Sequence, residues 1–188
     1  VVTLFAPLQG GRENYHEAEN GDFIFCVGSF LYRRKGGYEA LRLMLADFDT
    51  ETFDWRGTHG IFSLGIYKHG KLTLVTDGLG ACKLYTDRDH DIFSSAFSAA
   101  VHKTAPVSID VQGCYQYAWN GSVYGERTYL NEVRSIPCNT LPALDEAVAM
   151  VEKPSPYLPG ENLGCASLED AAEAMVARLR ELFGIYAA

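Results

Sequence analysis

The sequence has no long hydrophobic run, no excess of positive charge and no closely spaced pair of cysteines. No apolar stretch approaches the roughly 18 residues of a membrane-spanning helix, and the first residues lack the charged-then-apolar order of a signal peptide. A formal net charge of −8 gives no general attraction for nucleic-acid phosphates or anionic lipids, and the only tight basic run is Arg33, Arg34 and Lys35. We therefore expect a cytoplasmic protein that binds neither nucleic acid nor membrane.

The cysteines are odd in number, widely spaced and without a Cys-x-x-Cys pair, which indicates neither a disulfide framework nor a zinc site. We predict that they are buried free thiols: Cys26, Cys82, Cys114, Cys138 and Cys165. No other group of residues predicts a metal site.

Length and composition are those of a folded globular protein. The 188 residues suit one domain, or one domain with part of a second, and a composition of 47% hydrophobic residues is too apolar for a disordered chain. The chain opens at Val1 without a methionine and closes inside an expected helix, so we expect it to be a piece of a longer protein.

Hydrophobic periodicity predicts strands and helices in a segregated order rather than alternating strand-helix units. The expected elements are a strand at 22–32, a helix at 38–48, a hairpin at 60–77 turning at His69-Gly70, a short hairpin at 83–97, and helices at 94–102 and 107–117, the last capped by Asp110. Gly28 interrupts the first strand, which indicates a bulge, a close backbone approach or simple packing. This order favours an α+β fold with mainly antiparallel sheets and helices outside them.

A proline-rich stretch at 141–164 predicts one strand that leads into an exposed linker. Ser167 can then cap a final helix. The predicted organisation is a domain at 1–153, a linker at 154–166 and the start of a following helical region at 167–188.

Two signatures resemble the glutaminase domain of asparagine synthetases. The stretch GIFSLGIYKHGKLTLVTDGLGACKLYT resembles the family's Gly-x-Phe-(Ala/Ser) strand, hairpin and Arg-Asp-x-Leu-Gly-x-x-x-Leu-Tyr segment, with Asp77, Leu79, Gly80, Leu84 and Tyr85 at matching positions. YQYAWNGSVYGERTYLNEVRSIP resembles a second family run through Tyr117, Gly121, Tyr124, Arg127, Thr128 and Pro137. The resemblance covers roughly Asp22 to Val151. It implies the class II glutamine amidotransferase, or N-terminal-nucleophile (Ntn) hydrolase, fold: a four-layer αββα sandwich.

In that family an N-terminal cysteine attacks the glutamine amide, and its own α-amine moves the proton. Val1 has no nucleophilic heteroatom, Thr3 lies too far inside the chain, and an internal cysteine cannot supply thiol and free amine on one residue. We therefore predict no catalytic residue in this chain.

The resemblance also assigns remnants of two binding elements. Val27 and Gly28 stand where the family has the Asn-Gly pair of the oxyanion hole, so Gly28 keeps a backbone donor while Val27 offers no amide. Ser29 and Gly37 stand at substrate-binding positions; with Glu39 aligned to the family's glutamate, Gly37 replaces the aspartate that binds the α-amino group of glutamine.

Other candidate groups have ordinary structural explanations. Asp54, Thr58 and His59 could form a catalytic cluster, but a loop histidine is more often a solvated or capping group. The hairpin tip with Asp87, Asp89, His90 and Asp91 has hard-ligand character and is better explained as a solvated turn. Lys103, Arg127 and Arg134 are too scattered for a phosphate site. There is no Gly-x-x-x-x-Gly-Lys-(Ser/Thr) motif and no Ser-Gly-Gly-x-Asp run of the synthetase type.

The leading hypothesis is a degenerate glutaminase-like domain without glutaminase activity, a scaffold for a synthetase domain outside this chain, as in the similar β-lactam synthetases. ATP and Mg²⁺ are expected only in that downstream domain, and none in this one. Expected partners are the chain's own C-terminal synthetase domain and a second copy in a homodimer. Two alternatives stay open: an active glutamine-hydrolysing asparagine synthetase whose cysteine lies upstream of Val1, and a non-catalytic interaction module.

Overall fold

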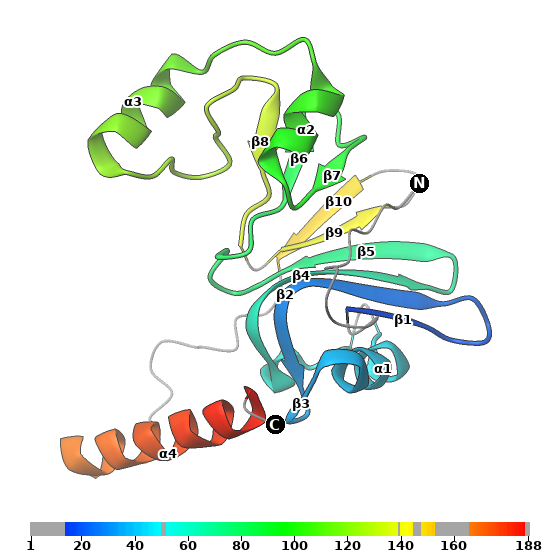
Figure 1. Ribbon diagram of the computed structural model, residues 1–188, viewed down its shortest axis with the longest axis vertical. Helices are drawn as coiled ribbons and strands as arrows, with labels where there is room; N and C mark the ends of the chain where they lie inside the picture. Colours follow the sequence, from blue (N-terminus) through cyan, green and yellow to red (C-terminus); the bar gives the residue numbers. More distant parts are fainter. Residues whose placement is uncertain (1–13, 50–51, 139, 145–147, 153–165, 187–188) are drawn as a thin grey trace.

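The computed structural model describes residues 14–49, 52–138, 140–144, 148–152 and 166–186 as an α+β fold with two antiparallel sheets (Figure 1). The larger sheet has the strand order β1 (Tyr15–Glu17), β2 (Phe23–Tyr32), β4 (Thr58–Lys68), β5 (Lys71–Thr76), β9 (Thr140–Leu144) and β10 (Val148–Glu152), with β3 (Lys35–Gly36) paired to β2. The smaller sheet has the order β7 (Phe93–Ser94), β6 (Tyr85–Asp87) and β8 (Val133–Ser135).

Four α-helices are described: α1 (Gly37–Asp47), α2 (Phe97–Thr104), α3 (Val111–Asn120) and α4 (Leu168–Tyr186), with a 3₁₀ turn at Trp55–Gly57. Figure 1 shows α1 below the larger sheet, and the smaller sheet with α2 above it. No helix of the described residues is long and apolar enough to cross a bilayer.

One face of the larger sheet packs against α1. Side chains alternate along a strand, so Ile24 and Cys26 of β2 point to this face together with neighbours on β4. They meet the apolar stripe of α1, in which Leu41 and Met44 are fully buried. The stripe predicted from helical periodicity is therefore confirmed.

The opposite face of the larger sheet carries a second, smaller core. Leu74 alternates with Val75 along β5, so Leu74 points away from α1. It packs with Leu84 and Ile136, which flank strands of the smaller sheet. This cluster joins the two sheets.

The β4–β5 hairpin turns at the predicted place. Lys68 pairs with Lys71, and the two residues between them have positive φ angles, 54° at His69 and 81° at Gly70. That geometry matches the right-handed twist of the flanking strands.

Lys68 also caps the C-terminal end of α1, whose last turn has no basic residue. The Nζ of Lys68 donates to the carbonyls of Leu45, Ala46 and Phe48 at 2.7, 3.1 and 2.8 Å.

Three sequence predictions need correction. The stretch after Leu141 contains two paired strands, β9 and β10, rather than one. The helix expected from 94 begins at Phe97, because Phe93 and Ser94 pair with β6. The helix expected from 107 begins at Val111, because Ile109 forms a bridge with Leu130.

Both predicted helix caps are confirmed. Asp110 accepts a hydrogen bond from the Gly113 N–H at 3.0 Å, and Ser167 accepts one from the Asp170 N–H at 3.0 Å. The linker predicted at 154–166 lies outside the described residues up to position 165, as do Val1, Thr3 and Cys165.

Candidate functional site

The segment Val27-Gly28-Ser29 lies in the middle of β2, directly against β4. Gly28 pairs with Phe62 in an unbroken register, so there is no bulge. Its φ is 96°, and a Cβ at this position would overlap the carbonyl oxygen of Ile61. Gly28 and Ser29 are exposed and Val27 is half-buried. Glycine is therefore required here by a close backbone approach and by a left-handed φ.

Asp77 organises the loop that follows β5. Its side chain is 1% exposed and accepts three backbone hydrogen bonds: Oδ1 from the N–H groups of Leu79 (2.8 Å) and Ala81 (3.2 Å), and Oδ2 from that of Cys82 (2.8 Å). Within the same loop Gly80 has a φ of 62°. The Asp-x-Leu-Gly spacing thus has a structural reason, because one carboxylate satisfies the donors of a tight turn.

These two segments, about 50 residues apart in the sequence, meet in space. Ser63, which pairs with Val27, donates its hydroxyl to the Cys82 carbonyl at 3.0 Å. The Cys82 thiol in turn donates to the Val27 carbonyl at 3.6 Å. We define this group as the remnant site: Val27, Gly28, Ser29, Ser63, Asp77 and Cys82.

The sequence did not single out Cys82 or Ser63 as members of the site. The spacing around Asp77 marks the loop, but a contact between Cys82 and β2 depends on how the loop folds back. No local pattern in the sequence could have revealed it.

The thiol of Cys26, next to the remnant site, is a poor nucleophile. Cys26 is buried, as predicted, and burial, followed by the nearby Cys82, raises the pKa of its thiol to about 12. Because the thiolate is the reactive form, Cys26 is inert near neutral pH. The prediction of buried thiols is wrong for Cys114 and Cys138, which are exposed, and Cys82 is only half-buried.

Gly37 is the first residue of α1 and has a φ of 55°. It follows Gly36, which pairs with Leu31, so it lies beyond the remnant site along β2. Glu39 is held by two hydrogen bonds from Arg42, at 3.0 and 2.8 Å, and these lower the pKa of its carboxyl. The structure places no carboxylate at position 37 that could bind an ammonium group.

The remaining candidates have separate structural partners. Thr58 donates its hydroxyl to the Trp55 carbonyl at 2.7 Å. Asp87 accepts from the N–H groups of Asp91 (2.8 Å) and Ile92 (3.3 Å), which closes the hairpin tip. Arg127 forms an ion pair with Asp110 at 2.7 Å. Within the described residues, no three His, Cys, Asp or Glu side chains gather closely enough to hold a metal ion.

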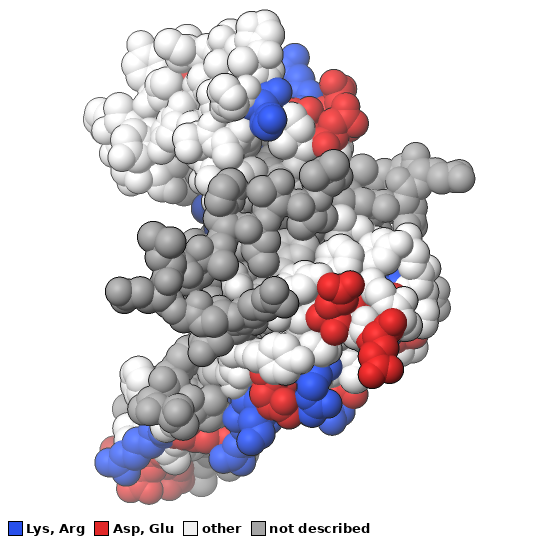
Figure 2. All heavy atoms as spheres, turned by 45° about the vertical axis from the view of Figure 1, so that its right-hand side comes forward, with Lys and Arg blue, Asp and Glu red and all other residues white. Residues whose placement is uncertain are grey.

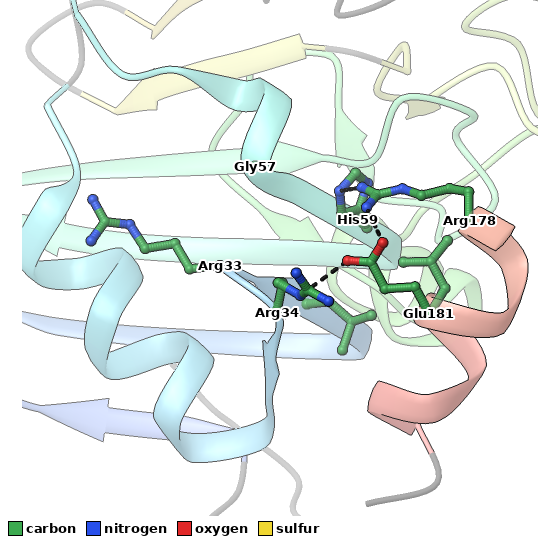
Figure 3. Close-up of a pocket in the computed structure, with 8 residues that line it drawn as sticks. Arg33, Arg34, Gly57, His59, Arg178 and Glu181 are labelled. Atoms are coloured by element: carbon green, nitrogen blue, oxygen red, sulfur yellow. Dashed lines mark hydrogen bonds and ion pairs between the residues drawn. The ribbon is translucent and has the colours of Figure 1, made fainter. Parts of the chain in front are cut away.

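His59 belongs to a pocket of about 250 Å³ between α4 and the end of β2 (Figure 3). The guanidinium of Arg178 lies 2.9 Å from His59 Nε2, so this nitrogen accepts the hydrogen bond and the ring is neutral. Glu181 accepts from Arg34 and from Arg178, both at 3.0 Å. These contacts attach α4 to the sheet.

No protein-family model matches the chain, and no curated protein matches it.

We predict that α4 detaches as the pH falls. Burial, and then the charge of Arg178, lowers the pKa of His59 below its usual 6.5. Arg178, Arg34 and Glu181 are the charged groups of this pocket that face one another around the ring. Above pH 6.5 His59 is neutral whether α4 is docked or detached, and docking has its full stability. Below pH 6.5 His59 takes up a proton more readily when α4 is detached, so docking weakens. The weakening ends once the pH is below the lowered pKa of the docked state.

Hydrogen exchange of the α4 amides, corrected for intrinsic rates, measures this effect. Protection should be lower at pH 5.5 than at pH 7.5. In His59→Gln, which keeps a neutral acceptor but cannot titrate in this range, the difference should vanish. An equal pH response in both proteins would show that another group controls docking.

Proposed function

We propose that this chain is a degenerate glutamine amidotransferase domain related to the asparagine synthetase and β-lactam synthetase family. In this proposal it has an Ntn-hydrolase-like αββα fold and does not hydrolyse glutamine. It serves as a scaffold for an ATP-dependent, amide-forming synthetase domain outside this chain.

The order of the packed elements supports this proposal. Helix α1 covers one face of the larger sheet, the smaller sheet packs on the other face, and α2 contacts all three strands of the smaller sheet. A helix, sheet, sheet, helix order is what the αββα sandwich requires.

The observation that carries the proposal is the contact between the first signature and the strand segment aligned with the family's oxyanion hole. The loop of Asp77 belongs to that signature, whereas Val27-Gly28 stands at the Asn-Gly pair and matches it at Gly28 alone; Cys82 joins the two through the Val27 carbonyl. Motifs that resemble one family by chance have no reason to meet. Here they form one site with a close backbone approach at Gly28 and a fully hydrogen-bonded turn at Asp77.

The remnant site and the residues near it lack groups that glutamine hydrolysis needs. Val27 has no side-chain donor for an oxyanion, and the loss of one such donor typically costs about 10²–10³ in rate. The Cys26 thiol is buried and protonated. Gly37 has no carboxylate for the α-amino group of glutamine. These defects lie on two different elements, β2 and α1.

A glutaminase assay tests the proposal. The chain should release no glutamate or ammonia from glutamine above the rate without protein. A diazoketone analogue of glutamine, which alkylates glutaminase cysteines, should label none of its thiols in a glutamine-protectable way. Glutamine-dependent release, or labelling of Cys82 that glutamine prevents, would contradict it.

The scaffold role has its own test in the full gene product. ATP-dependent amide formation should proceed with ammonia or an amine as nitrogen donor and should not proceed with glutamine. Efficient use of glutamine would instead favour the active amidotransferase with an upstream cysteine.

An exposed aromatic surface on α3 favours a second candidate function, the non-catalytic interaction module. Tyr115 and Trp119 are 69% and 89% exposed and lie four residues apart on one helix face. The stretch 111–125 contains no charged residue, and the region around α3 is almost free of charged atoms in Figure 2. Aromatic residues of this kind dominate protein interfaces. This candidate predicts that the full gene product consumes no ATP with any amine donor.

A further inference from the structure

The pocket between α4 and the end of β2, called the α4 pocket below, combines an apolar lining with convergent charged groups. Its volume is about 250 Å³, and its walls come from α4, the turn after β2 and the start of β4 (Figure 3). Leu31, Gly57 and Leu182 supply the apolar part of the lining. An apolar cavity with a few convergent polar groups is typical of a site for a small ligand.

The charged groups of the α4 pocket already hold one carboxylate. Arg34 and Arg178, which come from distant parts of the chain, both contact the carboxylate of Glu181 at 3.0 Å. The ring of His59 is neutral, because its Nε2 accepts from Arg178. Two guanidinium groups and one carboxylate leave one positive charge in excess, so the pocket suits a ligand with a single negative charge.

The turn that carries Arg34 has an unfavourable backbone for its sequence. Tyr32 pairs with Lys35, so Arg33 and Arg34 form a two-residue turn, and their φ angles are 47° and 63°. Positive φ at both central residues favours Asn-Gly, and a residue with a Cβ is strained there. Strain of this kind is concentrated at ligand-binding and catalytic sites.

Only one of the two strained arginines faces the charged groups of the pocket. Arg33 forms an ion pair with Asp47 at 3.1 Å, and Figure 3 shows it pointing away from Arg34 and Glu181. Arg34 points toward α4 and contacts Glu181 through its Nε. Within the described residues the other N–H groups of Arg34 have no partner, and its side chain is 74% exposed. The planar edge of a guanidinium can bind a second carboxylate through two parallel hydrogen bonds.

We propose that the α4 pocket binds an organic carboxylate with an apolar substituent. The carboxylate accepts from the free N–H groups of Arg34, and the substituent lies against Leu31 and Leu182. A phosphate ion fits less well, because it carries more negative charge than the pocket balances and has no apolar part to cover the leucines. The ligand chemistry is that of the C-terminus of a peptide or of a free branched carboxylic acid. The proposal does not depend on the proposed function.

Titrations followed by the NMR chemical shifts of the 188-residue chain test the ligand chemistry. N-acetyl-leucine represents a peptide C-terminus, and isocaproate is the same carbon skeleton without the amide. Both should bind with dissociation constants in roughly the millimolar range, as expected of a half-open site with one exposed charge contact. Tighter binding of one of the two identifies the source. N-acetyl-leucinamide and inorganic phosphate should bind at least roughly fivefold more weakly. Equal binding of the amide, tighter binding of phosphate, or no binding of either carboxylate would overturn the proposal.

Two matched variants locate the site. Arg34→Gln removes the guanidinium that binds the ligand, and Arg180→Gln removes the same charge from an exposed position of α4 outside the pocket. Arg34→Gln should raise the dissociation constant of N-acetyl-leucine roughly fivefold, and Arg180→Gln should leave it unchanged. Because both side chains are exposed, the fold should survive, which circular dichroism checks. Parent-like binding by Arg34→Gln would overturn the proposal.

Hydrogen exchange provides a second measurement. The ligand lies between the turn after β2 and α4, so it binds only while α4 is docked. At ten times the dissociation constant, it should therefore raise the protection of the α4 amides near Glu181 roughly tenfold. Binding without any change in the protection of α4 would place the ligand elsewhere and contradict the assignment to this pocket.

Discussion

Gly28→Ala should destabilise the fold by about 3 kcal/mol. A φ of 96° costs a residue with a Cβ roughly 1–2 kcal/mol, and the overlap with the Ile61 carbonyl adds an overpacking cost of roughly 1–3 kcal/mol. The overlap is with backbone rather than with a flexible side chain, so β2 and β4 have to move apart to relieve it. For a chain of this size the melting temperature should fall by roughly 6–12 °C.

Gly21→Ala separates the two contributions. Gly21 has a similar φ of 83°, but nothing lies within 4 Å of the position where its Cβ would be. Its substitution should cost only the conformational part, about 1 kcal/mol. Thermal unfolding of both variants measures the difference. If Gly28→Ala proves no worse than Gly21→Ala, the close approach of β2 and β4 at this point is not real.

Sequence reasoning succeeded where the structure depends on local patterns. The turn at His69-Gly70, the caps at Asp110 and Ser167, and the buried stripe around Met44 all follow from residues within one turn or one element. Each of these features is stabilised by contacts close in the sequence, so the sequence alone determines them.

It failed where the outcome depends on distant contacts. The contact of Cys82 with Val27 joins segments 55 residues apart, and that of His59 with Arg178 joins segments 119 residues apart. Cys114 lies on a solvent-exposed side of α3, although cysteine is usually buried. Composition and periodicity describe one helix or strand at a time, whereas these features depend on how two distant segments pack together.

Under the proposed function, the remnant site keeps the architecture of a glutaminase site without its chemistry. Gly28 and Asp77 shape the backbone, and both are intact, whereas Val27 and Gly37 stand where the resemblance expects groups that contact substrate. Loss of a substrate-binding side chain leaves the packing of the sheet unchanged, while loss of Gly28 or Asp77 would disturb it. This division is consistent with the proposed scaffold role, which needs the packing of the sheet but not the groups that contact substrate.

Asp77→Ala should destabilise the protein by about 3 kcal/mol, and Asp77→Asn by about 2 kcal/mol. The alanine leaves three backbone N–H groups without their acceptor, and each buried donor left unsatisfied costs roughly 1–3 kcal/mol. Leu79 lies in an exposed part of the loop, where water can replace the lost acceptor, so the total is less than the sum. In Asp77→Asn the remaining side-chain oxygen can still accept from the Leu79 and Ala81 N–H groups. The amide NH₂ then faces the Cys82 N–H, so two donors meet and this hydrogen bond is lost.

The Asp77 substitutions should also weaken the contact between the loop after β5 and β2, and this provides a second measurement besides unfolding. With the Cys82 N–H released, the Cys82 thiol should leave the Val27 carbonyl and react faster with an alkylating reagent, as followed by mass spectrometry of its peptide. Asp87→Asn is the matched control, since that carboxylate also accepts backbone N–H groups, but at an exposed hairpin tip where water can compensate. It should cost less than about 1 kcal/mol and leave Cys82 labelling unchanged. If Asp77→Asn and Asp87→Asn lower the free energy of unfolding equally, Asp77 is not buried as the structure has it. The structural link between the Asp-x-Leu-Gly motif and the Val27-Gly28 strand would then be contradicted as well.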